Sequence, residues 1–266
     1  MVIDLPAAAA HALDRGLRRR LTRAVRKSWL LTVLAALTLA LGLAAAAWVR
    51  SEPDRLYQRA QAEARAGRYD QAAATLGRLD RIPSPTPNLR LLRAQVAGAL
   101  GRTEAAVAEL RAIPDEDSLA PLARLSEGQL EARRGRLRAA ERAFRTTLKL
   151  TPQCAQARRE LVYIYSIQRR LPELDEQLNA LSEQGQLDLQ HLLHWGMVRH
   201  TEWDAEQDMI GLKRYLAADP DDRYSRLALA EALRQPGQTT AALETLAPLP
   251  DSDPDARAAR AALALA

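Results

Sequence analysis

The chain has 266 residues, of which 47% are hydrophobic and only 4% aromatic, and its formal net charge is +5. Alanine, leucine and arginine dominate, which favours helix, and alternating β-branched runs are almost absent, which argues against a sheet. Residues 1–50 hold eight Lys/Arg and two acids, whereas the rest holds 30 basic and 31 acidic residues, so the main body lacks the basic surface of a nucleic-acid-binding protein.

The segment Trp29–Val49 is the predicted transmembrane helix. Its 21 residues carry no charge, and at about 1.5 Å per residue they would cross a hydrocarbon core of about 30 Å. Trp29 and Trp48 stand at its two ends, where indole rings favour the headgroup level. Residues 1–28 form a basic leader. Because positive charge stays in the cytoplasm, we expect the leader to be cytoplasmic and residues 51–266 to be extracytoplasmic, in the periplasm of a bacterium.

A cleaved signal peptide is the alternative to this anchor. Residues 44–47 read AAAA and offer small side chains for cleavage before Trp48. The uncharged run is longer than the usual 7–15 residues of a signal-peptide core, and the charged leader is long, which favours the anchor. Cleavage would leave a secreted, soluble protein.

From residue 53 onward one short pattern returns at a fixed spacing. It reads AGRYDQAAATL from Ala66, LGRTEAAVAEL from Leu100, RGRLRAAERAF from Arg134 and PGQTTAALETL from Pro236. The first three glycines of the pattern are 34 residues apart, and the fourth lies three such steps further on: Gly67, Gly101, Gly135 and Gly237. A fixed period of 34 residues with helical patterning indicates stacked helix pairs.

This pattern resembles the tetratricopeptide repeat (TPR) family, in which each unit is a helix A, a turn and a helix B. The small position in helix A reads Ala60, Ala94, Gly128, Val162, Gly196 and Ala230. The early position in helix B reads Ala72, Ala106, Ala140, Leu174, Asp208 and Ala242, and the position four residues later reads Leu76, Leu110, Phe144, Leu178, Leu212 and Leu246.

The resemblance implies an all-α solenoid over residues 53–266, with about six repeats and a partial seventh or capping helix. Small residues let helix A approach helix B, and the apolar stripe on helix B is buried by stacking on the neighbouring pair, which predicts a continuous core. The turn carries Arg169 in the fourth unit and Trp203 in the fifth, which is the weakest. The phase returns after it at Pro220 and Gly237, and the last helix is expected to begin at Arg257.

Clusters that could carry chemistry have simpler interpretations. His191, His194 and His200 do not converge on one helix face, as a zinc site would require. The acidic stretches at residues 114–117 and 219–222 adjoin prolines at inter-repeat turns, and turn chemistry accounts for them. Cys154 is the single cysteine and has no activating neighbour. No catalytic motif occurs, so we expect no enzyme activity, no cofactor, no metal and no small-molecule substrate.

The candidate site is therefore a surface. In TPR arrays helix A lines the concave face, where partner peptides commonly lie. A glutamine recurs at one position of that face in three successive units and could hydrogen-bond an extended peptide, although glutamine is also an ordinary exposed helix former. The partner-binding positions expected from the register are Tyr57, Gln61, Leu91, Gln95, Leu125, Gln129, Arg159 and Tyr163.

These observations predict a single-pass membrane protein whose extracytoplasmic TPR domain is a scaffold for other proteins or extended peptide segments, without nucleic-acid partners. The chain resembles bacterial single-span TPR proteins in this organisation. One alternative is that the repeats recruit substrate for a larger membrane-associated enzyme whose catalytic domain follows Ala266. The other is the secreted soluble TPR protein that signal cleavage would release.

Overall fold

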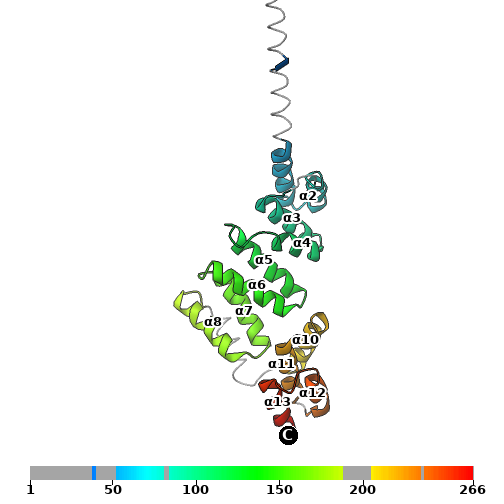
Figure 1. The fold of residues 1–266 in the computed structure, drawn as a ribbon, viewed down its shortest axis with the longest axis vertical. Helices are drawn as coiled ribbons and strands as arrows, with labels where there is room; N and C mark the ends of the chain where they lie inside the picture. Colours follow the sequence, from blue (N-terminus) through cyan, green and yellow to red (C-terminus); the bar gives the residue numbers. More distant parts are fainter. Residues whose placement is uncertain (1–37, 40–51, 81–83, 188–204, 235–236, 266) are drawn as a thin grey trace, which may run out of the picture.

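The structure is a computed structural model that describes residues 38–39, 52–80, 84–187, 205–234 and 237–265. Within these ranges the regular structure is all-α, and helices that are consecutive along the chain pack as pairs (Figure 1). The first pair is a helix over residues 52–65 with α2 (Tyr69–Gly77). The further helices are α3 (Pro87–Ala99), α4 (Thr103–Arg111), α5 (Ala120–Arg133), α6 (Leu137–Leu150), α7 (Ala155–Ile167), α8 (Leu171–Glu183), α10 (Ala205–Ala218), α11 (Arg223–Arg234), α12 (Thr239–Leu246) and α13 (Pro254–Ala264).

The recurring glycines occupy equivalent turns, as the period predicts. Each follows the first helix of a pair with a left-handed φ of 73° to 77°, a conformation that glycine adopts without Cβ strain: Gly67, Gly101, Gly135 and Gly237. At Gly101 the N–H donates to the carbonyl of Gly98, and the next N–H, of Arg102, donates to Ala97 at 2.8 Å. This pattern satisfies the last carbonyls of the first helix and reverses the chain into the second.

Arg169 makes the same turn in the fourth pair, although it carries a side chain. Its φ is +53°, and the N–H of Arg170 donates to the carbonyl of Tyr165 as in the glycine turns. A left-handed conformation costs a side-chain-bearing residue about 1–2 kcal/mol. The packing of α7 against α8 therefore determines the turn here, and the departure in sequence is not a departure in structure.

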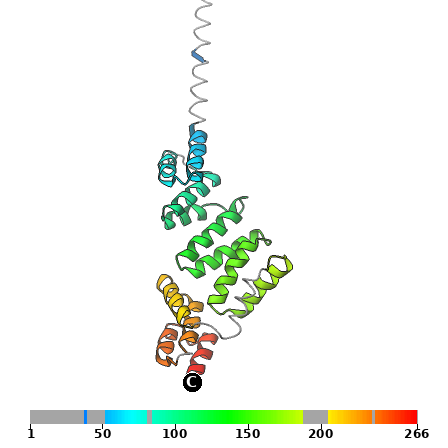
Figure 2. The same ribbon diagram turned by 180° about the vertical axis from the view of Figure 1, so that it is seen from behind.

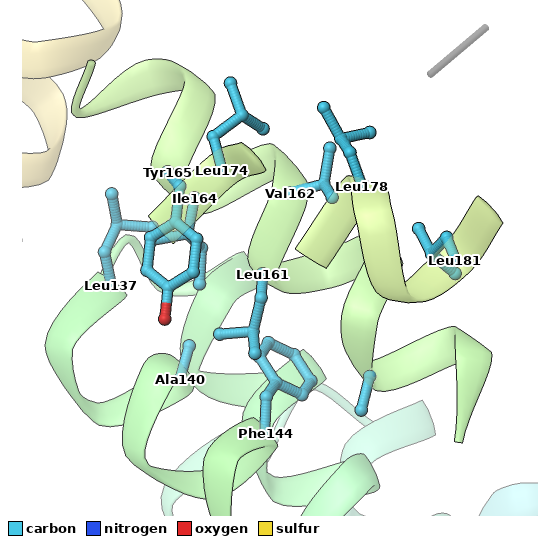
Figure 3. Close-up of a cluster of buried hydrophobic side chains, with 11 residues drawn as sticks. Leu137, Ala140, Phe144, Leu161, Val162, Ile164, Tyr165, Leu174, Leu178 and Leu181 are labelled. Atoms are coloured by element: carbon cyan, nitrogen blue, oxygen red, sulfur yellow. The ribbon is translucent and has the colours of Figure 1, made fainter. Parts of the chain in front are cut away.

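The predicted small and apolar repeat positions form the core. Ala72, Ala106, Ala140, Leu174 and Ala242 are completely buried on the second helices of their pairs. Figure 3 shows the cluster built by α6, α7 and α8, where Phe144 lies beside Leu161. Gly128 on α5 faces the Phe144 ring, and a Cβ added there would lie within 2.8 Å of three of its carbons. A small residue is thus required at this helix crossing.

The predicted stacking is confirmed as far as α8, and the next step along the chain, residues 188–204, lies outside the described residues. Up to α8 each pair packs on the one before it, but α10–α13 form a separate cluster that lies beside α7, with α8 on the outer side (Figures 1 and 2). Arg138 on α6 donates to both carboxylate oxygens of Asp219, which follows α10. A Cβ at Gly135 would lie 3.2 Å from the Ala218 Cβ, so α10 ends against the α5–α6 turn.

A buried polar cluster joins the two parts of the array. Arg170, at the α7–α8 turn, makes a bidentate pair with Glu141 at 2.8 and 3.1 Å, and its guanidinium lies 3.8 Å from the ring centre of Tyr224 at the start of α11. Next to it, the Gln168 amide donates to Asp222, which is fully buried. Because these contacts are directional, they fix where α11 begins relative to α7.

The last helix begins earlier than predicted. α13 begins at Pro254, three residues before Arg257, because Asp253 caps it. The Asp253 Oδ1 accepts from the N–H groups of Asp255 and Ala256 at 3.0 and 3.1 Å, and proline suits the first helical position because it lacks the unpaired N–H. Asp253 also accepts from Arg223, which holds α13 against α11.

The predicted transmembrane helix, residues 29–49, lies outside the described residues except for positions 38 and 39, and so does the leader, residues 1–28. In the part of the chain that the structure describes, no helix combines the length and the apolar character needed to cross a membrane.

Candidate interaction surface

A hollow of about 440 Å³ lies between α3 and α5, and we call it the front hollow. Its apolar wall and floor include Leu91, Leu122 and Leu130, and Gln95 and Gln129 stand at its polar side. Leu122 is 47% exposed, so its side chain is available to a partner. The volume is within the range of small binding sites and would accept one or two side chains of a partner.

A second hollow, of about 530 Å³, adjoins it between α5, α7 and α10, and we call it the rear hollow. Gln129 and Arg133 line both hollows, so the two adjoin each other, and we call the pair of hollows the trough. Tyr163 on α7 and Tyr215 on α10 complete the rear hollow, and their hydroxyl oxygens lie 3.2 Å apart. Burial, followed by this hydrogen bond, raises the pKa of Tyr215, so its hydroxyl stays protonated at physiological pH.

Four of the predicted partner-binding residues meet in the trough. Leu91, Gln95 and Gln129 line the front hollow, and Gln129 and Tyr163 line the rear hollow. The Gln129 Nε2 donates to Glu160 Oε1 at 3.2 Å, so this amide already has a partner within the chain. The glutamines therefore do not form a uniform ladder.

The other four predicted residues line neither hollow. Tyr57 and Leu125 are half-buried and pack against core clusters. Gln61 is half-buried on the first helix, away from the trough-lining residues. Arg159 donates to the Gln186 side chain at 3.1 Å, which holds it against the segment after α8.

The register argument missed several lining residues on α5. Leu122, Ser126 and Arg133 join Gln129 at spacings of four, three and four residues, which places all four on one face of the helix. The helical spacing from Gln129 could have identified them. Arg214 also lines the rear hollow, but it comes from α10, the second helix of its pair, and helix A positions alone could not have identified it.

The acidic stretches are turns, as predicted, with additional contacts. The Asp117 N–H donates to the carbonyl of Pro114, and Asp222 N–H donates to Asp219. Among the described residues no group of His, Cys, Asp and Glu could hold a metal ion. His191, His194 and His200 lie outside those residues.

The sequential helix pairs and their left-handed turns are arranged as in tetratricopeptide repeat proteins, and the chain is similar to three solved structures, two of which are described as TPR proteins. A TPR protein from Parabacteroides merdae is 13% identical, with a TM-score of 0.46, over 79% of this chain and 83% of that one. A thermophilic TPR protein from Thermus thermophilus is 22% identical, with a TM-score of 0.34, over 68% of this chain and all of that one. MamA is 12% identical, with a TM-score of 0.38, over 78% and 97%. No family model matches the sequence, and no curated protein matches it.

Proposed function

We propose that this chain is a single-pass membrane protein whose TPR-like array binds segments of partner proteins on the extracytoplasmic side. The trough is the observation that carries the proposal. It has an apolar floor, polar side chains at its edge and two adjoining hollows of about 440 and 530 Å³. Such a surface suits a chain segment that presents successive side chains better than it suits a compact small molecule.

The anchor and the side of the membrane are part of the same proposal and are supported by sequence. Trp29–Val49 is uncharged, and the basic residues are concentrated before it. Tethering to the membrane raises the effective concentration of the array toward membrane-bound partners, so modest affinity in the trough is sufficient.

Site-specific photocrosslinking tests where partners bind. A photoreactive amino acid at Gln95, which is exposed in the front hollow, should crosslink partner proteins in intact membranes. The matched control is Lys149, an exposed residue of α6 that lines neither hollow. Equal crosslinking at the two positions would contradict a role for the trough.

Topology is tested separately. A reporter that is active only outside the cytoplasm should be active when fused after Ala266, whereas activity of a cytoplasm-only reporter would refute the orientation. The intact mass of the mature chain distinguishes an uncleaved anchor from the secreted alternative.

A further inference from the structure

We propose that the trough selects acidic partner segments, with carboxylate side chains held by Arg133 and Arg214 and a neighbouring apolar side chain in the front hollow. The inference rests on the proposed function and specifies the chemistry of the partner.

Arg133, at the end of α5, lines both hollows, and its side chain is exposed. Its neighbour Arg134 pairs with Glu104 and Glu131, whereas Arg133 makes no ion pair within the described residues. Arg133 thus presents its donors to the trough, in the planar arrangement that binds a carboxylate with two hydrogen bonds.

Arg214 reaches the rear hollow from the other side. It lies on α10, is exposed and likewise has no ion-pair partner in the described part of the chain. The contact of Asp219 with Arg138 holds the end of α10 against the α5–α6 turn, and this position brings Arg214 to the same hollow as Arg133. Two guanidinium groups from helices far apart in sequence therefore line one cavity.

The remaining groups of the rear hollow do not cancel this charge. Glu160 is the carboxylate among its lining residues, and it accepts the hydrogen bond from Gln129. The hydroxyl groups of Tyr163 and Tyr215 bond to each other. Two positive groups against one negative group leave the lining with a net charge of +1, which is complementary to a carboxylate and repels a basic side chain.

The front hollow determines which partner residue would bind beside the acidic one. Because Gln129 and Arg133 line both hollows, a segment bound by the arginines continues directly toward Leu91 and Leu122. These leucines would bury an apolar side chain, which contributes affinity, while the arginines contribute selectivity. The partner motif is therefore an acidic residue close to an apolar one.

Three fluorescent peptides of equal length test the preference, built from alternating Leu–Glu, Leu–Gln and Leu–Lys. The full chain in non-ionic detergent carries the photoreactive residue at Gln95, and binding is measured by anisotropy and crosslinking. The acidic peptide should bind about five- to tenfold more tightly than the Gln peptide, which itself should bind more tightly than the Lys peptide. The acidic preference should weaken at high salt.

Charge reversal provides the matched variants. Arg133→Glu with Arg214→Glu should reverse the order of the Glu and Lys peptides, and Arg133→Gln with Arg214→Gln should remove the preference. Arg136→Glu with Lys149→Glu changes two exposed cations that line neither hollow and should leave the order unchanged. All four substituted cations are exposed, and circular dichroism should show the native helix content in each variant.

The outcomes separate the two proposals. If the Gln and Glu peptides bind and crosslink equally, the trough binds segments but the acidic preference is wrong. If the Arg133/Arg214 reversal keeps the acidic preference, the assignment to these arginines is wrong. If no peptide crosslinks at Gln95, both the inference and the proposed role of the trough fail.

Discussion

Gly128→Ala should destabilise the array, because Gly128 marks the closest approach of α5 to α6. The added Cβ would lie within 2.8 Å of three carbons of the Phe144 ring, where carbon atoms normally keep about 3.5–4.0 Å. Phe144 is fully buried, so its ring has no solvent-side space into which to move. Overpacking of this kind costs about 2–3 kcal/mol, and alanine regains about 1 kcal/mol over glycine in a helix. We expect a net loss of about 1–2 kcal/mol.

The measurement is thermal unfolding of the full chain followed by far-UV circular dichroism. A loss of this size should lower Tm by about 2–8 °C for an array of this length. Gly98→Ala is the matched control, since its Cβ would meet Leu130 Cδ2 at 3.6 Å, an ordinary contact. The same substitution there should be neutral or stabilising by up to about 1 kcal/mol, from helix propensity alone.

A double-mutant cycle isolates the steric cause. Phe144→Leu removes ring atoms from the crossing, so Gly128→Ala should cost less in that background, with a coupling energy of about 1 kcal/mol or more. If the costs of Gly128→Ala and Phe144→Leu simply add, or if Gly128→Ala is as stable as the natural chain, the close approach of the two helices is wrong.

Four further substitutions test other parts of the fold by the same unfolding measurement. Gly101→Ala should cost about 1–2 kcal/mol because φ there is +74°, although no atom would lie within 4 Å of the new Cβ. Arg170→Met should cost about 3 kcal/mol because it leaves the buried Glu141 without its bidentate partner. Tyr224→Leu should cost about 1 kcal/mol because it removes the contacts of the ring with the Arg170 and Arg223 guanidinium groups. Hydrogen bonds from Arg223 hold the pKa of Asp253 well below its usual value. The stabilisation of the folded state by ionised Asp253 is therefore complete above about pH 4 and is lost as the pH falls below that. Asp253→Asn should make the stability of the chain depend less on pH in that range.

Each of these predictions has a clear contrary result. An unchanged Tm for Gly101→Ala would show that the turn can be made without a left-handed residue. Equal losses for Arg170→Met and Tyr224→Leu would argue against the ion pair as the main element of the joint. If the stability of Asp253→Asn falls with acid as steeply as that of the natural chain, other carboxylates cause the pH dependence.

The helix pairs could be predicted from sequence because their determinants recur locally. A turn residue such as Gly67 and the small residue that follows it, Ala72, repeat at a spacing of 34, and each pair is decided within one such window. Even Arg169 takes the conformation that its position predicts, since the flanking helices impose it.

The placement of α10–α13 could not be predicted in the same way. The contacts that set it join Arg138 to Asp219 and Gln168 to Asp222, which are 81 and 54 residues apart. Neither separation is a multiple of 34, so the periodicity carries no information about them. The acidic stretch at Asp219–Asp222 was recognised as a turn, but a turn motif does not reveal which distant arginine or amide it will contact.

Part of the candidate site could likewise be predicted from the sequence, and part could not. Gln95 and Gln129 follow from the helix A register, and Arg133 could have been found from its spacing to Gln129 on α5. Arg214 reaches the trough because the long-range contact of Arg138 with Asp219 holds the end of α10 against the α5–α6 turn. The half of the surface built by consecutive pairs is thus readable in the sequence, whereas the half built by a long-range contact requires the structure.

The equivalent left-handed turns make the chain divisible into interchangeable modules. Excising residues 68–101 would join Gly67 directly to Arg102, so the first helix would meet α4 through a turn of unchanged geometry. Because side-chain direction advances by about 100° per residue, a cut of one or two residues more or less would point the apolar stripe of the following helix away from its neighbour. Whole-module deletion is therefore the length change that this architecture tolerates, although this particular excision would also remove α3 and with it one wall of the front hollow.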